Sequence, residues 1–157
     1  MKAITIWQPW ASAIALGDKC FETRGWSTDY RGPIAIHAAA KAPTKDIIDL
    51  FNYKYAWGET SFDLKLEKVG NEKILSIVNF SFGEPHYTYA PLGDIIAIAD
   101  LIDCVKITKE FRGNLPNMEL TLGDYRLGRY AWKLENVKKL DKPIPYKGQQ
   151  RLWNANI

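Results

Sequence analysis

The sequence has few of the residues that hold small folds together through covalent or metal bonds. It contains two cysteines, Cys20 and Cys104, and two histidines, with no CxxC spacing and no paired His and Cys positions. Small secreted scaffolds need several disulfides, and structural zinc sites need closely spaced Cys and His ligands. We therefore expect reduced cysteines, no metal and no cofactor.

Long apolar runs are also missing. No stretch of about 18 apolar residues is present, which argues against a transmembrane helix, and the first residues, MKAITIWQPW, lack the basic, apolar and small-residue sections of a signal peptide. We therefore expect a cytoplasmic protein that does not work on membranes. With 46% hydrophobic residues, a chain of 157 residues can bury one core, so we expect a single domain over residues 1–157 that acts as a monomer.

Charge is nearly balanced overall, at +3, but it is uneven along the chain. From Gly113 to the last residue there are eight basic and four acidic residues. A basic end suits an anionic partner such as a nucleic acid, and it is equally typical of an ordinary solvated surface. Both interpretations stay open on charge alone.

Local patterns predict several strands and a few short helices. Strands are expected at 3–7, 19–26, 31–37, 74–82, 93–107 and 128–140, helices at 9–17 and 44–57, and a loop at 84–91. The run at 93–107 is rich in Ile and Ala, which indicates a central strand buried on both faces. Trp153 is the expected anchor of a tail punctuated by Pro and Gly. This mixture predicts a compact, mostly β, mixed barrel or sheet.

The densest chemical motif follows the first expected helix, in the stretch ALGDKCFETRGW. It reads Gly17-x-Lys19-x-x-Glu22-x-Arg24, and Gly17 suits a left-handed helix cap. On a strand, Glu22 and Arg24 share one face and Lys19 points to the other. Lys19 can contact a phosphate or polarise a carbonyl, Glu22 can accept from an exocyclic amine or activate water, and Arg24 can orient Glu22 or clamp an anion. A solvated lysine beside a plain surface ion pair is the alternative.

The motif resembles the signature of the ASCH domain family, whose fold is a β-barrel similar to the PUA domain of RNA-modifying proteins. Five stretches look, in order, like blocks of the short bacterial and phage members: IWQPWASAIALGDK, YRGPIAIHAAAK, PLGDIIAIADLIDC, GRYAWKLENVKKL and KPIPYKGQQRLW. Only about residues 57–89 lie outside this likeness, and their structure stays open. The resemblance implies an α+β fold, a PUA-like mixed β-barrel with two or three short helices, and a cleft that receives RNA or a nucleoside.

The resemblance places the four motif residues in that cleft. Further candidates for ligand binding are Trp7, Trp10, Trp26, Arg129, Tyr130 and Lys147. An indole that stacks on a base contributes about 1–3 kcal/mol in single-strand binders. The tryptophans and Tyr130 equally suit a core or a cleft wall, Lys147 suits an ordinary surface, and His37 is expected to be a structural histidine.

The resemblance leaves two functions open. Some small ASCH proteins are amidohydrolases that remove the acetyl group from acetylated cytidine with a lysine, a threonine and a glutamate, and other members are reported to cleave RNA. Lys19 matches that lysine, but Glu22 stands where the hydrolases carry threonine, and Thr23 would face the other way on a strand. If the protein is an enzyme, we expect Glu22 to be the general base and Lys19 to stabilise the oxyanion. The main expectation is recognition of RNA or a modified nucleoside, and hydrolysis of an acylated nucleoside or of RNA is the alternative.

Overall fold

The structure is a computed structural model that describes residues 1–55, 61–69, 72–81 and 84–157. Between residues 53 and 89, side chains are described only at 64–68, 75 and 76.

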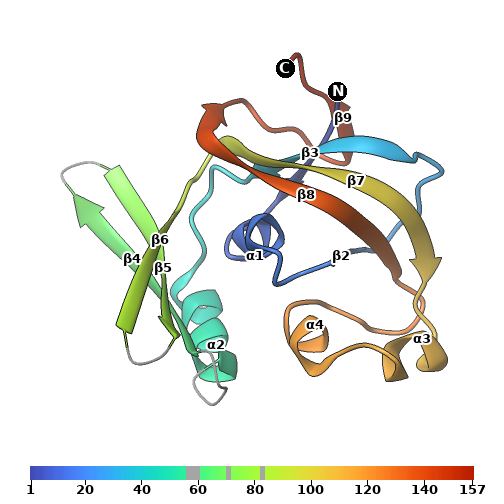
Figure 1. The fold of residues 1–157 in the computed structure, drawn as a ribbon, viewed down its shortest axis with the longest axis horizontal. Helices are drawn as coiled ribbons and strands as arrows, with labels where there is room; N and C mark the ends of the chain where they lie inside the picture. Colours follow the sequence, from blue (N-terminus) through green and yellow to red (C-terminus); the bar gives the residue numbers. More distant parts are fainter. Residues whose placement is uncertain (56–60, 70–71, 82–83) are drawn as a thin grey trace.

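The main sheet of the described chain has six strands in the order β2-β8-β7-β3-β1-β9 (Figure 1). The strands are β1 (Lys2–Ile6), β2 (Phe21–Arg24), β3 (Gly32–Ala38), β7 (Asp94–Lys106), β8 (Tyr130–Pro145) and β9 (Leu152–Asn154). The pair β1 and β3 is parallel and the other neighbours are antiparallel, so the sheet is mixed. Register shifts along β7 and β8 bend the two long strands, because an unpaired residue kinks its strand. The curled sheet confirms the expected α+β, PUA-like barrel, with β7 at its centre.

A second sheet of the described residues has three antiparallel strands, β4 (Ser61–Val69), β5 (Glu72–Ser81) and β6 (Glu84–Ala90). The prediction of a loop at 84–91 was wrong, since most of this stretch is β6. Its proline suggested a break, but β6 is an edge strand, where a missing N–H is tolerated, and aromatic residues favour strands. This sheet stands with α2 (Lys45–Tyr55) to one side of the main sheet (Figure 1).

Three shorter helices complete the described fold: α1 (Trp10–Leu16), α3 (Lys109–Gly113) and α4 (Asn117–Thr121). The sequence patterns predict α1 and α2 but miss α3 and α4, which are five residues each and too short to show a helical period. α1 packs under the sheet, where Ala11 and Ile14 join Ile4, Ile36 and Trp132 in the main core. Hydrophobic burial therefore fixes α1 against β1, β3 and β8.

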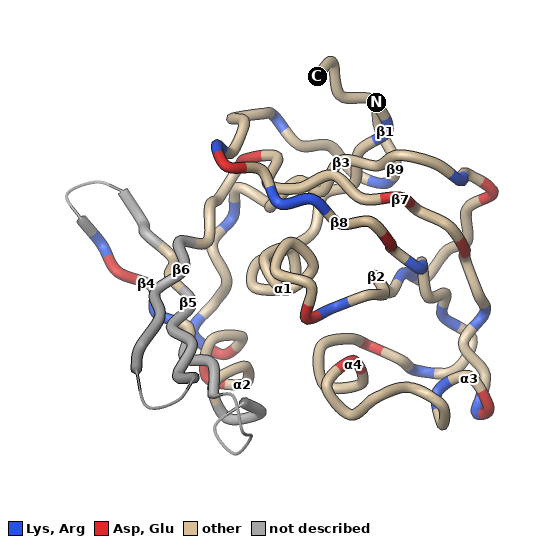
Figure 2. Tube along the Cα trace, viewed as in Figure 1, with Lys and Arg blue, Asp and Glu red and all other residues tan. Residues whose placement is uncertain are grey.

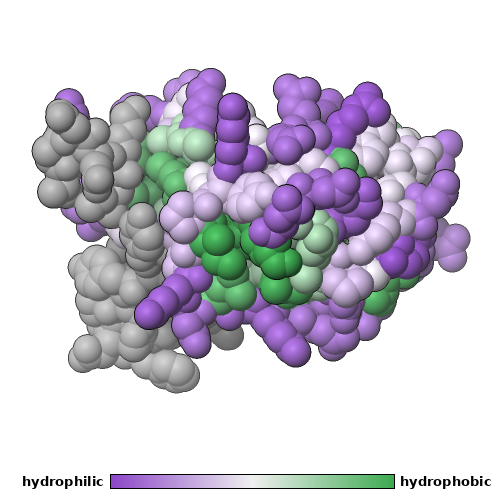
Figure 3. All heavy atoms as spheres, turned by 90° about the horizontal axis from the view of Figure 1, so that it is seen from above, coloured by the Kyte–Doolittle hydropathy of each residue, from purple (hydrophilic) through white to green (hydrophobic). Residues whose placement is uncertain are grey.

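The opposite faces of β1, β3 and β7 hold a smaller core. Ala3, Ala35 and Ile95 pack there with Trp153, which is buried and confirms the expected anchor of the tail. Outside this layer, the face seen from above is mostly hydrophilic around a small central hydrophobic area (Figure 3). In the described parts, no helix is long and apolar enough to cross a membrane.

Candidate functional site

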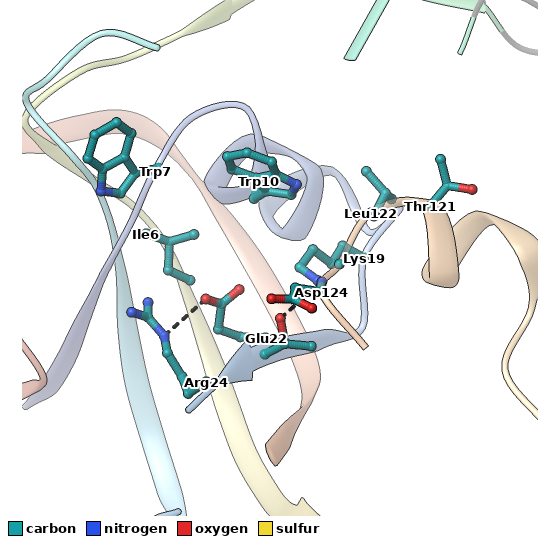
Figure 4. Close-up of a pocket in the computed structure, with 11 residues that line it drawn as sticks. Ile6, Trp7, Trp10, Lys19, Glu22, Arg24, Thr121, Leu122 and Asp124 are labelled. Atoms are coloured by element: carbon teal, nitrogen blue, oxygen red, sulfur yellow. Dashed lines mark hydrogen bonds and ion pairs between the residues drawn. The ribbon is translucent and has the colours of Figure 1, made fainter. Parts of the chain in front are cut away.

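A cleft of about 370 Å³ opens where α1, the start of β2 and the end of α4 meet (Figure 4). The end of β1, its connection to α1 and the loop after α4 also contribute, and the lining residues are Ile6, Trp7, Trp10, Lys19, Glu22, Thr23, Arg24, Thr121, Leu122, Gly123 and Asp124. Five of the predicted site residues, Trp7, Trp10, Lys19, Glu22 and Arg24, are therefore brought together in one cavity. Such a volume falls within the range of small-ligand pockets, about 300–1,000 Å³.

The two indoles of the cleft are positioned by a buried glutamine between them. The Gln8 side chain donates to the carbonyl oxygen of Pro91 at 2.9 Å and accepts from the Ser12 N–H at 3.1 Å. These bonds fix the connection from β1 to α1 on both sides. Trp7 stays 40% exposed and Trp10 is half-buried, so both rings offer apolar surface to a ligand.

Gly17 does not line the cleft, but it directs the chain into it. It ends α1 with a φ of 87°, in the left-handed region that favours glycine, as predicted. The N–H groups of Asp18 and Lys19 then bond back to the Ala13 carbonyl. This tight turn carries Lys19 inward, and only 1% of its surface is exposed.

The predicted orientation of Lys19 was wrong, because β2 begins only at Phe21. Lys19 precedes the strand, so strand alternation does not place it on the face opposite Glu22. Both side chains point into the same cleft (Figure 4). The alternative of a solvated lysine is also excluded by its burial.

The Lys19 ammonium is held by a weak set of contacts. Its Nζ atom lies 3.8 Å from Oε1 of Glu119 and 5.6 Å from the centre of the Tyr125 ring, and it has no hydrogen-bond partner among the described residues. Burial lowers the pKa of Lys19, and the negative charges of Glu22 and Glu119 oppose that shift. Lys19 is thus a desolvated amine with free donor capacity beside the cleft.

Glu119 is a functional neighbour that sequence reasoning missed. Its carboxylate accepts from the N–H groups of Cys20 and Phe21 at 2.7 and 3.2 Å, and from the Tyr125 hydroxyl at 2.5 Å. Burial and this hydrogen bond raise the pKa of Tyr125. Glu119 therefore joins α4 to the start of β2 and supplies the nearest negative charge to Lys19. The one feature of the sequence that could have pointed to Glu119 is that it is a glutamate within a short stretch otherwise rich in turn-forming residues.

Glu22 and Arg24 form the predicted pair, with 3.0 Å between Oε1 and Nε. Arg24 also donates to the carbonyl oxygen of Thr5 at 2.8 Å, which fixes the guanidinium against β1. The Glu22 carboxylate lies between Arg24 and Lys19 in the cleft (Figure 4). Thr23 lines the cleft too, and its hydroxyl accepts from the Asp124 N–H at 3.3 Å.

Two of the predicted ligand-binding residues support the cleft from outside it. Arg129 donates to the backbone carbonyls of Asp124 and Thr23 at 3.2 and 3.3 Å, so it ties the loop after α4 to β2. Tyr130 opens β8 and lies opposite Arg24 in the register of β2 and β8. Neither residue is among those that line the cavity.

The remaining candidates lie elsewhere. Trp26 is partly buried and packs edge-on against Trp132 of the main core, with 4.6 Å between ring centres. Lys147 lines a separate groove beside His37. His37 is buried and its Nε2 lies 2.9 Å from the carbonyl oxygen of Tyr146, which fits the structural role expected for it.

Charges of both signs gather at the cleft. Acidic residues lie on α4 and in the turn from α1 to β2, with a basic residue next to them (Figure 2). Lys19 and Arg24 line the cavity together with Glu22 and Asp124. Opposed donors and acceptors suit a neutral polar ring better than a simple anion. Among the described residues, no group of three or more His, Cys, Asp or Glu is placed to hold a metal ion.

Comparison with known proteins gives a family for this fold and cleft. The family model of the ASCH domain matches residues 4–144. Activating signal cointegrator 1 of Homo sapiens is 24% identical over 153 residues, and its Mus musculus counterpart is 23% identical over the same length. Each match covers 98% of this chain but 22% of the relative, so the chain spans about a fifth of these proteins. Because the family model covers most of the chain and every residue of the cleft, this protein belongs to the ASCH domain family.

Proposed function

We propose that the protein recognises RNA, or a modified nucleoside, by taking one base into the cleft of Lys19, Glu22 and Arg24. The ASCH family is associated with RNA binding, and the chain belongs to it. The observation that carries the proposal is the buried Lys19 amine, which has no hydrogen bond among the described residues and faces a cavity walled by Trp7 and Trp10. A buried donor without a partner is costly for the fold, and a ligand that accepts from it recovers that cost.

The cleft offers a contact to each part of a base: a donor to a ring carbonyl, an acceptor to an exocyclic amine and an apolar surface to the flat ring. Lys19 donates to a ring carbonyl oxygen, and Glu22, held by Arg24, accepts from an exocyclic amine. Trp7 and Trp10 offer apolar surface to the flat ring, since every base has a π-face that packs on an indole. A bare phosphate would use the lysine and arginine but would be repelled by Glu22. The proposal is therefore base recognition.

Exchange of Glu22 for glutamine should weaken binding of short single-stranded RNA and of the matching nucleoside about 10- to 100-fold. The amide keeps the shape but loses a charged acceptor, and a hydrogen bond to a charged group contributes about 1.5–3 kcal/mol. Fluorescence titration of the tryptophans at low salt measures both affinities. Glu135→Gln, an exposed position on β8, is the matched control and should bind like wild type. Equal affinity of Glu22→Gln and wild type would remove Glu22 from the recognition.

Hydrolysis is the second candidate, and the lowered pKa of Lys19 favours it. An amine desolvated beside two carboxylates, those of Glu22 and Glu119, is typical of a catalytic centre as well as of a binding site. In that scheme Glu22 removes a proton from the attacking water and Lys19 stabilises the oxyanion. Thr23, also in the cleft, has its hydroxyl engaged with Asp124 and is less suited to attack.

Incubation with acetylated cytidine and with short RNAs, followed by mass analysis, separates the two candidates. A recognition protein returns every substrate with its mass unchanged. Products that form with wild type and disappear in both Glu22→Gln and Lys19→Met would replace recognition with hydrolysis. Products that persist in both variants would place the chemistry outside this cleft.

A further inference from the structure

A second groove, of about 460 Å³, lies next to the cleft and shares Trp7 with it. Thr5 of β1 and His37 of β3 contribute to it, together with residues 39–41 after β3 and the segment 146–150 after β8. Trp7 is 40% exposed and borders both cavities. A chain molecule that contacts one side of this indole can therefore continue into the other cavity.

The far wall of the groove is firmly positioned. Gly148 lies so close to His37 that an added Cβ would stand 2.3 Å from Cε1, and only glycine permits this approach. The carbonyl oxygen of Tyr146 accepts from Nε2 of His37 at 2.9 Å, and the Tyr146 ring packs 5.3 Å from that of Trp153. The Nδ1 atom of His37 is buried there without a hydrogen bond in the described structure. Tyr146 and Gly148 are thus held closely against His37 of β3.

The groove differs from the cleft in its charge. Lys41 and Lys147 line it with Gln149 and Gln150, and no Asp or Glu is found among the described residues that line it. The Lys41 ammonium stands 5.4 Å from the centre of the Trp7 ring, beside the wall that separates the cavities. Lysine, amide side chains and backbone N–H groups are the usual partners of phosphate and sugar oxygens.

We propose that this groove binds the sugar-phosphate backbone of the nucleotide next to the one whose base enters the cleft. The ligand is then a single strand of at least two nucleotides, with the backbone passing Trp7. This inference rests on the proposed function and narrows it from a free nucleoside to a strand. A basic groove joined to an aromatic platform is the usual design of single-strand binders.

The test compares Lys41→Gln/Lys147→Gln with wild type, using the four homotetraribonucleotides and their nucleosides as probes. The double variant should bind the preferred tetranucleotide about tenfold more weakly and bind its nucleoside as wild type does. The slope of log affinity against log salt should become shallower by about 1.4, which corresponds to two phosphate contacts on a single strand. Lys138→Gln/Lys139→Gln, two exposed positions on β8, removes the same charge elsewhere and should change neither affinity.

The outcomes separate this inference from the function on which it rests. If wild type binds no probe at low salt, both fail together. If the nucleoside binds as tightly as the tetranucleotide and the Lys41→Gln/Lys147→Gln variant changes nothing, base recognition stands and the groove is not a backbone site. An equal loss in both double variants would also overturn the inference, because it would show attraction by overall charge alone.

Discussion

Methionine in place of Lys19 should reduce the affinity for RNA at least 100-fold while leaving the fold as stable as wild type or more stable. The amine is 1% exposed and has no hydrogen bond among the described residues, so in the free protein its charge is poorly compensated. Methionine fills a similar volume without a charge to desolvate. Binding should be lost because Lys19 is the only buried amine among the described residues that line the cleft, and methionine cannot donate to the ligand.

The difference in free energy of unfolding between wild type and Lys19→Met should change with pH in one direction. Because burial lowers the pKa of Lys19, the unfolded chain binds the extra proton at pH values where the folded chain has lost it. Wild-type stability therefore rises relative to Lys19→Met as pH climbs from the lowered pKa toward the ordinary lysine value, about 10.4. At pH values below the lowered pKa of Lys19, the folded wild type carries the full cost of the buried charge. The free energy of unfolding of Lys19→Met then exceeds that of wild type by the largest amount.

Urea unfolding of both proteins at several pH values, together with RNA titration, checks this prediction. Lys138→Met, at an exposed position on β8, is the control and should retain binding. A Lys19→Met protein that is clearly less stable than wild type would make Lys19 a structural residue. Retained RNA binding would remove it from the site.

Alanine in place of Glu119 should destabilise the protein by about 3–5 kcal/mol, because three donors lose their acceptor and each buried donor left unsatisfied costs about 1–3 kcal/mol. The change leaves the N–H groups of Cys20 and Phe21 and the Tyr125 hydroxyl without their acceptor. It also removes the nearest carboxylate from Lys19. Since α4 and the start of β2 are joined through this side chain, the cleft should lose its shape as well.

Glutamine at position 119 should cost less than alanine, because its one carbonyl oxygen can still accept from the Phe21 N–H and the Tyr125 hydroxyl, while its amide nitrogen no longer accepts from the Cys20 N–H. Glu135→Ala serves as the exposed control, and its loss should be small because exposed ion pairs contribute little. Chemical denaturation measures the free energy of unfolding of Glu119→Ala, Glu119→Gln and Glu135→Ala and so ranks the three variants. If Glu119→Ala unfolds at the same denaturant concentration as wild type, the glutamate does not hold the cleft together.

Local patterns were enough to predict the parts of the site that lie close in sequence. Gly17 ends α1 because its left-handed backbone suits glycine, and Glu22 pairs with Arg24 because neighbours two apart on a strand share a face. The apolar run of β7 predicted its central place in the sheet. Each of these follows from backbone preference or side-chain period within a few residues.

What the sequence could not predict depends on long-range contacts. Glu119 meets the backbone of Cys20 from 99 positions away, and no local pattern encodes that approach. The side on which Lys19 lies depends on where β2 begins, because a residue before the strand does not follow the alternation of its side chains. The groove of Lys41 and Lys147 likewise joins segments more than a hundred residues apart, brought together by the pairing of β3 with β7 and β7 with β8.

The most direct test of base recognition in the cleft is a ¹H–¹⁵N NMR titration with a short single-stranded RNA. The indole N–H signals of Trp7 and Trp10 and the backbone signals of residues 19–24 should shift, and Lys19→Met should abolish these shifts. Shifts confined to the exposed basic residues of β8, with the cleft signals unchanged, would contradict the proposed function.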